Sequence, residues 1–175
     1  MNYWLFAFTF LLHSAPVGSS NEVRWSADRK LTFSDFQGND LSDSQWCANT
    51  STSMYFHYDL INGQLKNISA YSTFVPSESW MKKNIPAVLD HEQLHFDITE
   101  YCSRKFCAEA ATYDGCPHEK TKLKQLFNEV NKECDQMQQL YDDETAHGLN
   151  RDAQQQWSNK MNELLKESTD YTARK

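Results

Sequence analysis

The stretch that decides the fold is VLDHEQLHFDITEYCSRKF, from Val88 to Phe106. Apolar residues recur along it at intervals of three and four, which is the spacing of a helix packed against a core. Pro86 suits the first turn of such a helix, because a proline there removes no helical hydrogen bond. The spacing therefore predicts a long helix from Pro86 to about Thr112.

The same stretch contains His91-Glu92-Gln93-Leu94-His95, which is the HExxH pattern. On a helix the two histidines lie on one face, about 6 Å apart along the axis, so both can bind one zinc ion. Glu92 then lies where it can take a proton from a zinc-activated water without being a ligand. The alternative is an ordinary helix that carries two histidines, because so short a pattern also arises by chance.

A catalytic zinc takes a third protein ligand and leaves one position open. The metzincin extension of HExxH would need Gly and His where this chain has Ile98 and Tyr101, which excludes that class. The better source is YDDETAHG, Tyr141 to Gly148, in which His147 is the predicted third ligand and Asp142 the next choice.

Three further residues of the second predicted helix are candidates for the site. Glu129 and Glu133 are more distant alternatives for the third ligand. Tyr141 is a candidate catalytic residue, because its phenol could donate to a developing oxyanion; packing in the core is the other interpretation. For His147 the alternative is a cation that interacts with the end of a helix dipole.

Residues 1–20 contain the apolar run YWLFAFTFLL followed by the small residues SAPVGSS. This is the pattern of a secretory signal peptide, and the run is too short to span a bilayer, although a membrane anchor is the alternative. We expect residues 1–20 to be a signal peptide and residues 21–175 to form one domain. The protein is then predicted to be secreted or periplasmic.

Charge narrows the choice of partners. Lys and Arg number 17 against 24 Asp and Glu, which gives a net charge of −7, and there is no basic run. Nucleic acid and anionic membrane surfaces are therefore not expected as partners, and no membrane contact is expected after leader cleavage. A peptide or protein substrate fits better, and the oligomeric state is open.

Five cysteines are present, and a secreted protein can form disulfides. No CxxC pair exists, which argues against a cysteine-ligated zinc. Folding the long helix against a second one places Cys102 near Cys134 and Cys107 near Cys116. These are the preferred disulfides, with Cys47 left over, although four cysteines allow three pairings.

The N-terminal half is rich in aromatic and β-branched residues and predicts short strands: VRW, LTFSDF, TSMYFHYDL and QLKNISAYSTFV. Asn62-Gly63 between the last two is the favoured dipeptide of a two-residue hairpin turn. Ser77 can cap a short helical turn in SESWMKKN. A second helix is expected over residues 119–147, and Asn150 can cap a third.

Four segments together resemble a known family: LTFSDFQG, SESW, HEQLHFDITE and YDDETAHGLNRDAQQQW. Their succession is similar to the bacterial secreted domain-of-unknown-function family 922, whose members are described as predicted secreted zinc-dependent proteases. The resemblance implies a leader, an α+β fold, and a zinc site with His91, His95 and the YDDETAHG segment. Leu94, where the family usually has Gly, and the cysteines are departures.

We therefore expect an α+β, zincin-like fold with an N-terminal antiparallel β-sheet followed by a helical half. The predicted function is a secreted zinc metallopeptidase that uses zinc-activated water, with Glu92 as general base. The alternatives are a non-catalytic, zinc-stabilised binding module and a zinc amidase acting on cell-wall peptides.

Overall fold

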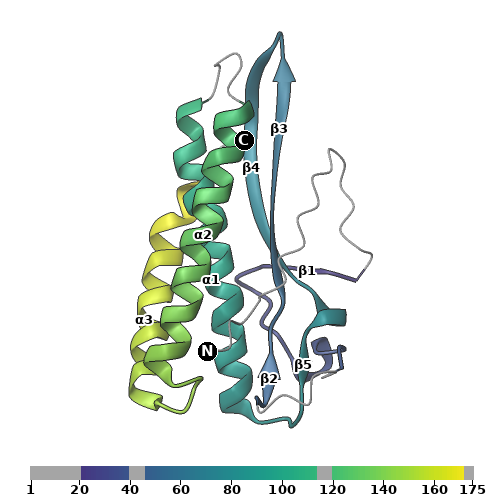
Figure 1. Cartoon of the computed structure of the whole chain (residues 1–175), viewed down its shortest axis with the longest axis vertical. Coiled ribbons are helices and arrows are strands. Elements are labelled where there is room, and N and C mark those ends of the chain that lie inside the picture. The colour runs from purple at the N-terminus through teal and green to yellow at the C-terminus, as the bar shows by residue number, and fades with distance from the viewer. Residues whose placement is uncertain (1–20, 40–45, 114–119, 172–175) are drawn as a thin grey trace, which may run out of the picture.

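The computed structural model describes residues 21–39, 46–113 and 120–171. Small antiparallel sheets come first in the chain, and three helices that pack together follow (Figure 1). The predicted α+β class is therefore confirmed. The predicted signal peptide lies outside the described residues.

A long hairpin dominates the β half. Strand β3 (Thr52–Ile61) pairs antiparallel with β4 (Gln64–Phe74), and the short β1 (Val23–Arg24) pairs with the other edge of β4. Asn62 and Gly63 form the turn with φ values of 52° and 79°, as a two-residue hairpin turn of this type requires. The hairpin prediction is confirmed, and β3 is left at the edge of the three-stranded sheet.

The helical half contains α1 (Pro86–Ala110), α2 (Lys120–Thr145) and α3 (Arg151–Glu167). Pro86 occupies the first turn of α1, and the side chain of Asn150 accepts a hydrogen bond from the Ala153 backbone N–H at the start of α3. All three helices were expected at these places. Two short 3₁₀ turns, η3 (Ala111–Tyr113) and η4 (Ser168–Tyr171), follow α1 and α3.

Two N-terminal predictions were wrong. LTFSDF is not a strand, because Asp35 accepts hydrogen bonds from the backbone and hydroxyl of Thr32 and so caps the 3₁₀ turn η1 (Phe33–Asp35). A short helical turn does occur at SESWMKKN, but Ser77 lies inside the 3₁₀ turn η2 (Pro76–Glu78) and Val75 is its N-cap. Strand β5 (Trp80–Met81) follows and pairs with β2 (Ala48–Asn49).

Helix α1 is the central element of the molecule, because it contacts the hairpin and both other helices (Figure 1). Its apolar residues join one core with the hairpin and α2, in which Ile98, Phe106 and Leu123 are fully buried. On another face, Asp97 accepts a hydrogen bond of 2.7 Å from the Trp25 indole. The N-terminal segment is thereby tied to the helix that carries HExxH.

The cysteines lie partly as predicted. Cys102 and Cys134 are buried and face each other between α1 and α2, but they are free thiols rather than a disulfide. A hydrogen bond between the two thiols, together with burial, raises the pKa of Cys134. Cys107 and Cys47 are also free, and Cys116 lies outside the described residues, so its predicted pairing with Cys107 stays a prediction.

None of the helices within the described ranges is both long and apolar enough to cross a membrane.

Candidate metal centre

The two histidines of HExxH lie near the start of α1 and face α2. His91 is 4 % exposed and the side chain of His95 is 12 % exposed. Their rings stand nearly perpendicular, with centroids 4.8 Å apart, and their Nε2 atoms are 3.2 Å apart. The helix therefore does bring both ring nitrogens to one point, as the spacing predicts.

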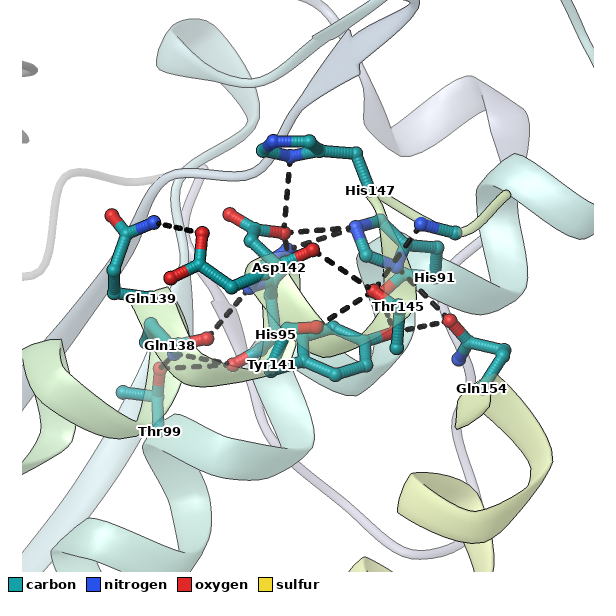
Figure 2. Close-up of polar contacts among 12 residues, drawn as sticks. His91, His95, Thr99, Gln138, Gln139, Tyr141, Asp142, Thr145, His147 and Gln154 are labelled. Carbon is teal, nitrogen blue, oxygen red and sulfur yellow. Dashed lines mark hydrogen bonds and ion pairs between the residues drawn. The ribbon is translucent and has the colours of Figure 1, made fainter. Parts of the chain in front are cut away.

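Asp142 of α2 completes this group. Its Oδ1 is 3.1 Å from the Nε2 of His91 and 3.1 Å from the Nε2 of His95 (Figure 2). The three atoms thus form a nearly equilateral triangle. Ligands placed about 2.0 to 2.1 Å from a tetrahedral zinc stand about 3.3 Å apart, so the triangle has the size of one face of such a site. His91, His95 and Asp142 could together hold a metal ion.

Two glutamines orient the histidine rings. The Gln138 side chain donates a hydrogen bond of 2.9 Å to the His95 backbone carbonyl, and this fixes its Oε1 at 2.6 Å from Nδ1 of His95. Oε1 of Gln154 lies 3.0 Å from Nδ1 of His91. A carbonyl oxygen only accepts, so Nδ1 of His95 carries a proton. The same holds for Nδ1 of His91 with the Gln154 amide in this orientation, in which the buried Nε2 of Gln154 has no partner among the described residues. With Nδ1 protonated, a ring that also donates from Nε2 to Asp142 is a charged imidazolium. Loss of that Nε2 proton leaves a neutral ring whose lone pair faces the shared point, as metal ligation requires.

The ionisable groups of the site shift one another's pKa values. Burial would raise the pKa of Asp142, but hydrogen bonds from His91 and His95 outweigh it and hold that pKa well below its usual range. Burial opposes protonation of His95, yet the hydrogen bond and charge of Asp142, with the charge of Glu92, raise the pKa of His95. Asp142 is therefore ionised and able to serve as a ligand.

Glu92 follows His91 on the same turn and is only 6 % exposed. It lies outside the ligand triangle, and its charge acts on His95. A buried carboxylate beside a candidate ligand set is the arrangement that a general base needs. Glu92 thus neighbours the candidate ligands without being one of them, and its role as general base stays a prediction.

The predicted third ligand, His147, is not in the triangle. It follows the end of α2, and its Nδ1 is 3.5 Å from Oδ1 of Asp142. Its side chain is 39 % exposed, and its ring packs on that of Trp46 with centroids 4.0 Å apart. The geometry favours Asp142, the next choice from the sequence, because Asp142 lies on the buried face of α2 and His147 lies past the helix end.

Tyr141 is fully buried behind the histidines. Its ring stacks on His91 with centroids 4.6 Å apart. Its hydroxyl donates to Oε1 of Gln154 at 2.8 Å and lies 3.2 Å from the His91 backbone carbonyl. Burial raises the pKa of Tyr141 far above its ordinary value. These contacts give Tyr141 a supporting place in the site, and they do not favour the oxyanion role expected from the sequence.

The remaining alternatives for the third ligand are exposed and do not belong to the ligand triangle. Glu129 is exposed on α2, and Glu133 is exposed and pairs with Lys105. Neither belongs to the group of His91, His95 and Asp142.

Sequence reasoning missed Gln138 and Gln154, although a signal for Gln138 exists. Buried residues recur at intervals of four along α2, and the series ends in polar side chains: Val130, Cys134, Gln138 and Asp142. Polar residues that continue an apolar stripe face the core and need partners there. This pattern picks out both Gln138 and Asp142, whereas nothing comparable marks Gln154.

A comparison with known protein families agrees with this arrangement. The family model described as bacterial protein of unknown function (DUF922) matches residues 15–148. The chain belongs to the DUF922 family. The match covers every residue of the ligand triangle and ends at Gly148, so α3 and Gln154 lie beyond it. Searches of curated proteins and of solved structures find no match.

Proposed function

We propose that this DUF922 protein is a zinc-dependent peptidase that acts outside the cytoplasm. The observation that supports it best is the ligand triangle, in which two imidazole nitrogens and one carboxylate oxygen converge at 3.1 to 3.2 Å. Two imidazole nitrogens and a carboxylate oxygen that converge in a buried place could bind a metal cation once the Nε2 protons are lost. The buried Glu92 follows His91 directly, as in the HExxH pattern.

The donor set fits zinc. Imidazole and carboxylate are zinc ligands, three protein ligands leave a fourth position open, and hydrogen bonds to the outer ring nitrogens match the usual support of metal-bound histidines. The same donors also suit iron(II). Glu92 beside the site favours hydrolysis, and hence zinc.

Different residues of this chain would bind the metal, transfer the proton and orient the ligands. His91, His95 and Asp142 would hold the metal, which when bound supplies Lewis acidity that activates water and polarises a carbonyl group. Glu92 would accept the proton of the attacking water and return it to the leaving amine. Gln138 and Gln154 would keep both imidazoles in the required tautomer.

A place for an extended substrate lies next to these residues. β3 is the edge strand of its sheet, and the hydroxyl of Thr52 in β3 lies 2.8 Å from that of Thr99, one turn after His95. An edge strand offers unpaired backbone groups to an extended peptide. We expect a peptide or protein substrate to lie along this edge.

The first test is metal analysis and peptide hydrolysis on the wild type and matched variants. Wild type and His147→Ala should retain zinc, whereas His91→Ala and Asp142→Ala should lose it. Glu92→Gln should keep the zinc and lose hydrolysis of a broad fluorogenic peptide library. Loss of zinc from His147→Ala but not from Asp142→Ala would contradict this assignment of the ligands.

The same experiment separates the rival functions. A wild type that holds zinc and cleaves nothing in peptide libraries, while hydrolysing cell-wall peptide amides, is an amidase. A wild type that holds zinc and hydrolyses neither class is a zinc-stabilised binding module.

A further inference from the structure

The chain between α2 and α3 adopts a left-handed conformation at three successive residues. The φ values are 48° at Ala146, 54° at His147 and 80° at Gly148. Glycine takes this conformation freely, but it is uncommon for a residue with a side chain. Such strained positions persist where surrounding contacts impose them, and they concentrate at functional sites.

Contacts to the metal centre hold this turn in place. The backbone N–H of His147 donates to the carbonyl of Asp142 at 2.9 Å. Gly148 lies so close to His91 that a Cβ at position 148 would stand 3.1 Å from Cγ of that ring. The turn is thus fixed against a ligand of α1 and a ligand of α2.

Figure 2 shows the His147 ring beside the Asp142 carboxylate, on the opposite side of that carboxylate from Tyr141. Three imidazoles contact the Asp142 carboxylate, and the side chains of His91 and His95 are 6 % and 12 % exposed. The His147 side chain is 39 % exposed and stands 3.5 Å from Oδ1. It is therefore next to the ligand atoms, outside their triangle, and open to a molecule that approaches from solvent.

We propose that His147 is a catalytic residue that donates a ring N–H to the carbonyl oxygen of the scissile peptide bond, with Trp46 holding the ring against rotation. This inference rests on the proposed peptidase function. A donor fixed in advance at the oxygen that gains negative charge stabilises the transition state more than the bound substrate. The Tyr141 hydroxyl cannot serve instead, because it is buried and donates to Gln154.

Three variants in this turn distinguish the role of the His147 side chain from that of the backbone conformation. His147→Gly removes the donor and keeps a backbone that tolerates positive φ. His147→Asn keeps a side-chain N–H on a residue that accepts this conformation. Ala146→Gly is the matched control, because Ala146 is a left-handed neighbour whose backbone hydrogen bonds, among the described residues, go to Asp143 and Leu149 rather than to the ligand triangle.

In the zinc-loaded full chain, His147→Gly should keep its zinc and lose about 100-fold or more in kcat/KM, mainly through kcat. His147→Asn should recover part of that loss, and Ala146→Gly should stay near the wild type. A phosphinic peptide with alanine on both sides mimics the tetrahedral intermediate. His147→Gly should bind it more weakly by a factor similar to the loss in kcat/KM.

Contrary results have distinct meanings. Loss of zinc from His147→Gly makes His147 a ligand. Equal phosphinic peptide binding and hydrolysis in wild type and His147→Gly overturns this inference alone. His147→Asn no better than His147→Gly argues against hydrogen-bond donation. A zinc-loaded wild type that neither binds the phosphinic peptide nor hydrolyses peptides overturns the proposed function as well.

Discussion

At the scale of single residues, the neutral amide of Gln138 determines which nitrogen of His95 faces the ligand triangle. Gln138→Leu keeps the size of the side chain and removes the acceptor. We expect zinc affinity to fall about 10- to 100-fold, because the ring loses the partner that fixes its tautomer and orientation. Competition against a chromophoric chelator measures the affinity.

Gln139 provides the matched control for Gln138. It is exposed on the next position of α2 and donates only to Asp143 among the described residues. Gln139→Leu should bind zinc as the wild type does. Equal zinc affinities in the two variants would show that the amide of Gln138 does not support the metal site.

Gly148 and Gly63 share a left-handed backbone with φ near 80°, but their surroundings differ. A Cβ at Gly148 would press on the ring of His91, whereas a Cβ at Gly63 meets nothing within 4 Å. Both Gly→Ala changes should lower the free energy of unfolding by about 1 to 2 kcal/mol. Only Gly148→Ala should also weaken zinc binding, because only there must a ligand move.

Urea unfolding and zinc titration of both alanine variants test this distinction. Unchanged zinc affinity in Gly148→Ala would mean that His91 can shift without leaving its coordinating position.

At the scale of elements, the contact between α1 and α2 carries the thiols of Cys102 and Cys134. An oxidising compartment favours joining them. The raised pKa of Cys134 and its burial keep the folded thiol unreactive, so we expect the disulfide to form during folding rather than after it. Refolding with oxidised glutathione should yield the bond, and folded reduced protein should stay reduced under the same conditions.

The bond should stabilise the protein by about 3 to 4 kcal/mol through the loop that it closes. Peptide mapping locates it, and urea unfolding with and without reductant measures its effect. Cys107→Ser is the control and should retain the Cys102–Cys134 bond. Rapid oxidation of the folded protein, or no bond after oxidative refolding, would contradict the expectation.

At the scale of the whole molecule, the candidate metal centre joins α1 and α2, with α3 supplying Gln154, so binding of the proposed zinc would be linked to folding. Zinc at 100 times its dissociation constant should add about 2.7 kcal/mol to the free energy of unfolding. Calcium and magnesium should add little, because they prefer sites built from oxygen ligands. Thermal unfolding of the apo protein with each ion measures the shift, and His95→Ala should remove it.

Much of the fold could be predicted because its signals are local. Asn62-Gly63 defines the β3–β4 hairpin, and the spacing after Pro86 defines α1. The pairing of Trp80 with Asn49 could not be predicted. It depends on contacts between distant residues, such as the hydrogen bond of 2.9 Å from the Ser51 backbone to the Ser79 hydroxyl, and short strands of two residues carry no periodic signal.

The candidate site was predictable to the extent that it lies on regular helix. His91 and His95 follow from helical spacing, and Asp142 could have been ranked first from its place in the buried series on α2. The sequence ranks His147 above Asp142, and the structure reverses this order because His147 follows the end of α2. Beyond the helix end, helical spacing no longer gives the direction of a side chain. The left-handed turn sets the direction of the His147 side chain.

The ligand triangle and its glutamine supports come from helices alone: His91 and His95 from α1, Gln138 and Asp142 from α2, and Gln154 from α3. The hairpin supplies none of these side chains, although Thr52 at the start of β3 contacts Thr99 one turn after His95. The hairpin turn lies toward the C-terminal end of α1 (Figure 1). The candidate centre could therefore be transferred to another helical scaffold. A minimal three-helix scaffold that reproduces these crossings is a starting point for building the same site without the sheet.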